Sequence, residues 1–130
     1  MAAYEILEHT ADLGFRVRAA SEEELFGRAA ESLAAIVMDT SAARARERYP
    51  VAAAGEGSLE ERLVHYLNEV LWLMDARGVA PARCTPEAVW GEPRDAARHA
   101  PRLVVKAVTF HQLRVWRDAA GWGAEVFLDV

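Results

Sequence analysis

Cysteine is nearly absent from this sequence, and so are the signals of secretion. Cys84 is the one cysteine among 130 residues, so no disulfide can form within one chain, and a reducing compartment is favoured. The first residues lack the basic and apolar segments of a signal peptide. No apolar run approaches the roughly 18 residues that cross a membrane. We therefore expect a cytoplasmic protein without a membrane anchor.

An excess of positive charge is absent too. The formal net charge is −5 at pH 7, and the isoelectric point is near 5.4. An acidic chain of this kind lacks the basic footprint that binding to a nucleic-acid backbone requires. The charge argues against free-standing nucleic-acid binding, but it leaves open docking to a protein that itself binds RNA.

Common catalytic motifs are missing as well. The sequence has no phosphate-binding P-loop, no GxGxxG dinucleotide motif, no GxSxG nucleophile elbow and no CxxC pair. Lysine is also rare, because 14 of the 15 basic residues are Arg and only Lys106 is Lys. The position of the single lysine is therefore informative.

What the sequence does contain is material for a core. Hydrophobic residues make up 52% of the 130 residues, which is enough to bury a core and argues against disorder. One domain spanning residues 1–130 is the expected organisation for a chain of this length.

The N-terminal half predicts a hairpin and two helices. Residues Tyr4–Glu8 and Leu13–Ala19 have strand patterns, the second with clear alternation, and the polar turn His9–Asp12 joins them. Ser21 and Ser58 each begin a capping-box sequence that is followed by apolar residues at helical spacing.

The remainder of the chain predicts mostly strands. Gly78 suits the position just after the second helix, and one strand is expected between the helices at Tyr49–Ala54. The later strand segments are Val79–Trp90, which Pro81 and Pro86 interrupt or place at an edge, and then Leu103–Phe110, Gln112–Arg117 and Trp122–Leu128. The predicted fold class is α+β, with two helices packed on a mostly antiparallel β-sheet in the order ββαβα followed by β-strands.

The last predicted strand ends on two carboxylates, which are the side chain of Asp129 and the α-carboxylate of Val130. If the fold brings Asp12 to them, the three groups form an oxygen-ligand site of the kind that Ca²⁺ and Mg²⁺ prefer. Two plainer interpretations stay open. Asp12 could be a turn residue that bonds its own backbone, and the chain end could be frayed and solvated.

Lys106 interrupts an apolar strand pattern, and alternation puts it on the same face as Val104, Val108 and Phe110. A lysine at such a place either extends to solvent at an edge or meets an acid. A compact ammonium in a chain otherwise rich in arginine favours a role as a point charge.

His9 and His111 are the histidines nearest to these segments. They could join a zinc or iron site, but their spacing does not support one, and support of a loop through hydrogen bonds is the simpler interpretation. His65 and His99 are predicted at the surface. The four tryptophans are interpreted as core and strand packing, because basic residues are not interleaved densely enough for a base-stacking platform.

Together these segments resemble the archease family from end to end. The resemblance rests on four segments, Tyr4–Asp12 (YEILEHTAD), Ser21–Phe26, Lys106–His111 (KAVTFH) and the terminal pair Asp129–Val130. Each segment is weak alone, but the combination is specific.

The resemblance implies a function that residue spacing does not show. It implies an accessory protein, not an enzyme, that activates the GTP-dependent RNA ligase which joins tRNA halves and other RNAs with 2′,3′-cyclic or 3′-phosphate ends. Such a protein promotes guanylylation of the ligase's active-site histidine and allows multiple turnover. The implied partner is the ligase, and RNA is contacted only through it.

The resemblance also implies the residues of a site. It implies Ca²⁺ binding through Asp12, Asp129 and the α-carboxylate of Val130, with Lys106 as the positive member of the same patch. Two other functions fit these residues and stay open at this point. One is a stand-alone divalent-metal phosphohydrolase, for which a nucleophile and its base are missing, and the other is a chaperone-like scaffold without chemistry.

Overall fold

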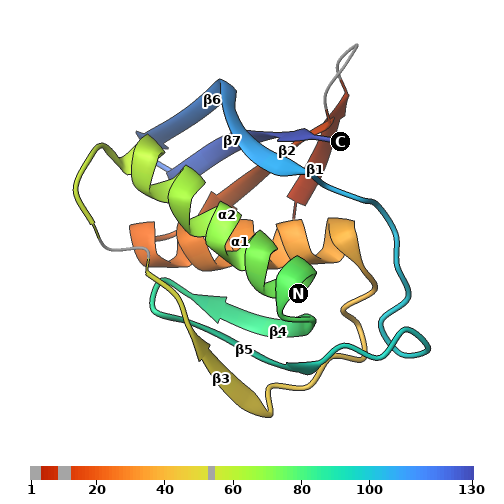
Figure 1. Ribbon diagram of the computed structural model, residues 1–130. Coiled ribbons are helices and arrows are strands. Elements are labelled where there is room, and N and C mark those ends of the chain that lie inside the picture. The colour runs from red at the N-terminus through yellow and green to blue at the C-terminus, as the bar shows by residue number, and fades with distance from the viewer. Residues whose placement is uncertain (1–3, 9–12, 53–54) are drawn as a thin grey trace.

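The computed structural model describes residues 4–8, 13–52 and 55–130, which form two helices and two antiparallel sheets (Figure 1). The helices are α1 and α2, and the order of elements along the chain is ββαβαββββ. The bounds are β1 Tyr4–Glu8, β2 Leu13–Ala19, α1 Glu22–Val37, β3 Glu47–Pro50, α2 Leu59–Ala76, β4 Val79–Thr85, β5 Ala88–Pro93, β6 Ala107–Asp118 and β7 Gly121–Asp129.

The two helices lie between the two sheets. One sheet has the strand order β1-β2-β7-β6 and the other has the order β3-β5-β4. Helix α1 contacts β2 and β7 on one side and β4 on the other, and α2 contacts β6 and β4 in the same way (Figure 1). The predicted α+β class with two helices and antiparallel strands is confirmed. The strands are divided between two sheets because each helix packs apolar residues against both of them.

The helices begin and end where their capping residues predict. The Ser21 hydroxyl accepts a hydrogen bond from the backbone N–H of Glu24 at 3.1 Å. Ser58 and Glu61 form a full capping box, with each side chain bonded to the other's backbone N–H. After α2, Gly78 adopts a φ of +62°, a conformation that glycine reaches without steric cost.

The core is built by the layer of helices and the faces of the sheets toward it. Alternate residues of β2 and β7 point to the helices, and Phe15 and Leu128 among them are fully buried. Between the helices, the rings of Phe26 and Tyr66 lie 5.4 Å apart at 54°, a tilted geometry that aromatic pairs favour. The Tyr66 hydroxyl also donates to the carbonyl of Thr85 at 2.9 Å, which ties α2 to β4.

Several strand boundaries differ from the predicted ones. The strand expected at Tyr49–Ala54 is Glu47–Pro50, and the segment Val79–Trp90 turns back on itself to form parts of β4 and β5. Pro81 lies in β4, at the edge of its sheet, where a residue without an N–H interrupts no ladder.

Strand β6 replaces two predicted strands. It begins at Ala107 and runs without a break to Asp118, so the segment from Leu103 to Lys106 precedes it as irregular chain. The pairing with β7 shifts between Thr109 and Arg114, and Gln112 in that interval has a φ of +56°. A non-glycine residue with positive φ marks the bulge that lets one strand continue through the interruption.

Within the residues that the structure describes, no helix is both long enough and apolar enough to cross a membrane. The two helices are instead amphipathic or buried elements of the core, as their contacts with both sheets require.

Replacing Gly27 with Ala tests the close contact between α1 and β4. In an exposed helix this change would add about 1 kcal/mol of stability through helix propensity. A Cβ at Gly27 would collide with the backbone carbonyl of Cys84, so we expect the free energy of unfolding to fall by about 1–3 kcal/mol. Urea denaturation measures the change. Gly55→Ala is the control, because a Cβ there meets nothing within 4 Å, and equal effects of the two substitutions would contradict the prediction.

Candidate functional site

Three strand ends meet at one end of the four-stranded sheet. β2 begins at Leu13, which lies opposite Leu128 of β7. β6 begins at Ala107, which lies opposite Asp129. This register puts Lys106, Asp129 and Val130 together, and we call these three residues the sheet corner. Figure 1 shows the C-terminus at this end of the sheet, close to the hairpin of β1 and β2.

The sheet corner is joined by its backbone and exposes its charges. The N–H of Lys106 donates to the backbone carbonyl of Asp129 at 2.8 Å, while both side chains are exposed. Among the described residues, no side chain bonds to the Asp129 carboxylate or to the Lys106 ammonium. The two charged groups are therefore available to a ligand or a partner.

The structure differs from the alternation that was predicted for the strand around Lys106. Val108 is buried at 4% exposure, whereas Val104 and Phe110 are 81% and 53% exposed, and Lys106 is exposed like them. The strand starts after Lys106, so alternation does not extend back through it. Exposed apolar side chains consequently flank the sheet corner.

Two of the predicted site residues, His9 and Asp12, lie outside the described residues. His111 is exposed on β6, in the irregular interval around Gln112. Within the described ranges, no group of three His, Cys, Asp or Glu residues is arranged to hold a metal ion. The described donors at the sheet corner are carboxylate oxygens, a set that fits a hard cation such as Ca²⁺.

The outer face of the same sheet carries a groove of about 640 Å³ whose charges are already paired. Arg16 donates through Nε to Glu125 at 2.8 Å and through Nη1 to Glu5 at 2.9 Å. Arg114 donates to the other oxygen of Glu125 at 3.3 Å. The hydrogen bonding of the Arg16 guanidinium to the Glu125 carboxylate, which accepts, is the main cause that raises the pKa of Arg16. These arginines are neutralised, so the groove does not present the free positive charge that an RNA backbone would need.

The tryptophans are packed less deeply than predicted. Trp72 is 52% exposed on α2, so the interpretation as core packing is wrong for it. Trp116 lies on the outer face between the guanidinium groups of Arg18 and Arg114, whose carbon atoms are 5.9 and 5.3 Å from its ring centre. Cation–π stacking explains why this ring can stay partly exposed on a strand.

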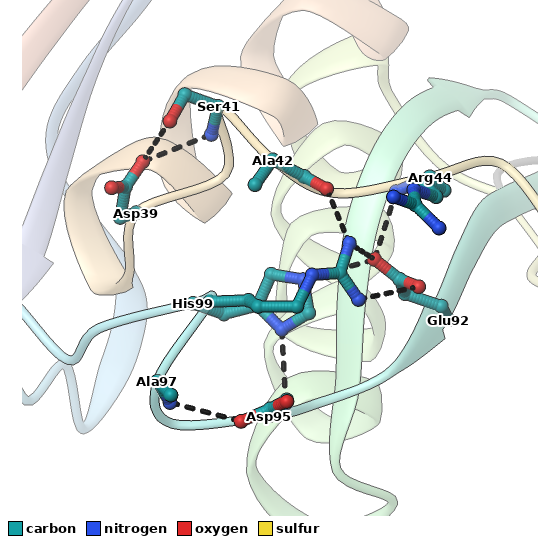
Figure 2. Close-up of polar contacts among 9 residues, drawn as sticks. Asp39, Ser41, Ala42, Arg44, Glu92, Asp95, Ala97 and His99 are labelled. Atoms are coloured by element: carbon teal, nitrogen blue, oxygen red, sulfur yellow. Dashed lines mark hydrogen bonds and ion pairs between the residues drawn. The ribbon is translucent and has the colours of Figure 1, made fainter.

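A buried polar network joins the second sheet to two loops (Figure 2). His99, predicted at the surface, is fully buried, and so is the Glu92 side chain beside it. The Nε2 atom of His99 lies 3.0 Å from Oε2 of Glu92. Its Nδ1 atom accepts from the N–H of Asp95 at 2.9 Å, which assigns the ring proton to Nε2 as the donor to Glu92. The prediction for His99 was wrong because a polar loop sequence does not reveal a buried carboxylate partner.

Arg98 and the loop before β3 complete this network. The guanidinium of Arg98 donates to both oxygens of Glu92, at 3.1 and 2.8 Å, and to the carbonyl of Ala42 at 2.7 Å. The N–H of Arg44 donates to Glu92 at 3.0 Å (Figure 2). The Arg98 hydrogen bonds are the main cause that lowers the pKa of Glu92 to about 2. Every partner of this carboxylate is internal, so the network holds loops in place and is not a ligand site.

The whole fold is similar to proteins of one family. The model of the archease protein family matches residues 4–130. An archease from Methanopyrus kandleri is 34% identical over 139 residues, covering 98% of this chain and 99% of that protein. A solution structure of a Methanobacterium thermoautotrophicum protein has a TM-score of 0.78 at 27% identity, covering 100% of both chains. The fold of a Thermotoga maritima archease, described as a possible chaperone, matches with a TM-score of 0.54 at 20% identity, over 100% of this chain and 99% of that one.

The Glu92 network predicts a loss of stability in acid. The folded-state pKa of Glu92 is about 2, below its ordinary value of 4.5, so its contribution is present above pH 4.5 and is lost as the pH falls toward 2. We expect Glu92→Gln to lower the Tm at pH 7, and the difference from the parent protein to shrink between pH 4.5 and 2. Thermal melts across this pH range measure it. Glu56→Gln, at an exposed position, is the control, and a difference that does not depend on pH would refute the assignment.

Proposed function

Because this chain belongs to the archease family, we propose that it activates a GTP-dependent RNA ligase and is not itself the enzyme. The ligase joins RNA ends that carry 2′,3′-cyclic or 3′-phosphates, as in tRNA splicing. The chain promotes guanylylation of the ligase's active-site histidine and allows repeated turnover. The observation that carries the proposal is the sheet corner, where exposed groups of opposite charge meet at one end of a sheet.

The proposal includes a Ca²⁺ site formed by Asp12, Asp129 and the α-carboxylate of Val130. Support comes from the donors, which are the oxygen ligands that a hard cation prefers. Strand β2 starts directly after Asp12, and its first residue, Leu13, lies opposite Leu128, the residue before Asp129. This pairing is further support for the site. A bound Ca²⁺ ion supplies concentrated positive charge beside these carboxylates and reduces their mutual repulsion.

The residues of the sheet corner can act on the partner's phosphoryl-transfer site through charge and position. Barriers to phosphoryl transfer depend mainly on the placement of metal ions and on neutralisation of the developing charge. The Asp129 carboxylate can attract and orient the ligase's metal ions, and the Lys106 ammonium can hold an anionic oxygen of the nucleotide. Both side chains are exposed, so they reach a partner without any unfolding of this chain.

The charge distribution supports contact with RNA through the ligase and not directly. The chain carries a net charge of −5, and the arginines of the outer groove are paired with Glu5 and Glu125. A protein of this kind works in the cytoplasm beside its ligase, where its one cysteine stays reduced.

Two rival functions are separated from this one by simple assays. A phosphohydrolase would cleave phosphate esters without the ligase, whereas the proposed activator leaves them intact. A chaperone-like scaffold would stimulate the ligase equally well after loss of the corner carboxylates, since folding assistance needs no charged group at that place.

Removal of the corner carboxylates tests the activator role. We expect Asp12→Ala and Asp129→Asn to reduce the stimulated rate of ligase guanylylation by at least about tenfold, the lower range for groups that tune a metal site. Single-turnover assays with purified ligase and GTP measure the rate. Asp75→Asn, at an exposed position on α2, is the matched control. Stimulation equal to that of the parent protein would exclude the proposed role of these acids.

Extension of the chain beyond Val130 tests the α-carboxylate. A short C-terminal tag converts this group to a neutral amide and moves the charge away, so we expect Ca²⁺ affinity to fall by at least about tenfold. Isothermal titration of matched N-tagged and C-tagged proteins measures the affinities. Equal affinity would contradict the ligand role, and full ligase stimulation by the C-tagged protein would favour the scaffold function.

A further inference from the structure

Strand β6 is an edge strand, and one of its residues has backbone groups that no strand can satisfy. Among the strands that the structure describes, which have the order β1-β2-β7-β6, only β7 pairs with β6. Val108 lies opposite Leu128, but its N–H and C=O bond to a side chain on α2 and not to β7. These two groups face the free edge, where an antiparallel strand leaves every second residue unpaired.

The carboxamide of Asn68 on α2 satisfies both groups. Its Oδ1 accepts from the N–H of Val108 at 2.9 Å, and its Nδ2 donates to the carbonyl of Val108, also at 2.9 Å. The second hydrogen of Nδ2 goes to the carbonyl of Val64, one turn earlier in the helix, at 3.1 Å. The three bonds orient the amide, because only one nitrogen–oxygen assignment supplies two donors and one acceptor in these places.

We propose that Asn68 is a positioning residue of the sheet corner, an inference that rests on the function proposed above. Val108, the residue that Asn68 binds, is two positions from Lys106. The residue opposite it on β7, Leu128, immediately precedes Asp129. The bulge around Gln112 begins just beyond it. Asn68 therefore holds the regular start of β6 between an irregular segment on each side, and it ties the sheet corner to a long helix.

A merely structural role has a different consequence. If Asn68 only blocked the edge or stabilised the fold, any other lost tie of α2 would have the same effect on the sheet corner. Tyr66 provides such a tie, since its hydroxyl bonds to the carbonyl of Thr85 in the other sheet. A positioning role predicts that only the Asn68 bonds affect Lys106 and Asp129.

The test compares Asn68→Asp and Asn68→Ala with the control Tyr66→Phe. Asp keeps the acceptor and the shape of Asn but loses the donor, and it brings a carboxylate against the carbonyl of Val108. Ala removes all three bonds of the carboxamide. Each of the three substitutions removes at least one side-chain hydrogen bond to a strand. Circular dichroism identifies any variant that fails to fold.

The readout uses the single lysine of the chain. Reductive ¹³C-methylation labels Lys106 as the only lysine signal in an NMR spectrum, and amide exchange reports on Lys106 and Val108. We expect both Asn68 variants to shift the Lys106 signal, to speed exchange of both amides at least tenfold, and to weaken Ca²⁺ binding about tenfold, the effect of lost outer-shell support at a metal site. Tyr66→Phe leaves all three unchanged.

The outcomes separate this inference from the proposed function. Asn68 variants that match Tyr66→Phe in the Lys106 signal and in both amides overturn the positioning role, even if the parent protein activates the ligase. A shifted Lys106 signal with faster amide exchange supports it, even if the parent protein gives no stimulation, which would instead refute the activator function.

Discussion

The register of β7 is the constraint on which the rest of this structure depends. β7 pairs on both sides, and Leu128 lies opposite Leu13 of β2 and Val108 of β6. Leu128 is fully buried toward the helices, whereas Asp129 is exposed. A slip by one residue would exchange their faces and bring the carboxylate toward the core. Burial of the apolar set therefore selects the register, and the register brings Asp129 to Lys106.

The molecule treats charge in two different ways on its two sheets. Near the three-stranded sheet, Glu92 is buried and its bonds to Arg98, His99 and Arg44 are all internal. A carboxylate buried in this way would be costly without each of these partners, so the network orders two loops. At the sheet corner the charges are exposed and unshared among the described residues. Exposed charges of that kind contribute about 0–1 kcal/mol to stability, so their arrangement contributes little to the fold and is available for binding.

The sequence predicts the fold well where local signals act alone. The hairpin of β1 and β2 and the helix starts at Ser21 and Ser58 follow from alternation and capping, and the structure confirms them. The second sheet is not predicted, because β3 has only four residues and its pairing with β5 is set by contacts distant in sequence. The continuity of β6 depends on the positive φ of Gln112, and no residue pattern predicts that conformation.

The candidate site also has one part that local sequence signals predict and another that depends on contacts distant in sequence. Taken alone, the acidic residues of the sequence have no common role. The likeness to a family is what assigns them one. The structure adds the adjacency of Lys106 and Asp129, while Asp12 and His9 stay predictions. His99 and Asn68 were missed for a shared reason, since their partners are a buried carboxylate and a strand edge, neither of which is visible before the chain is folded. The polar residues hardest to predict are thus those that position the loops and strands, and the exposed charges that they leave free are easier to find.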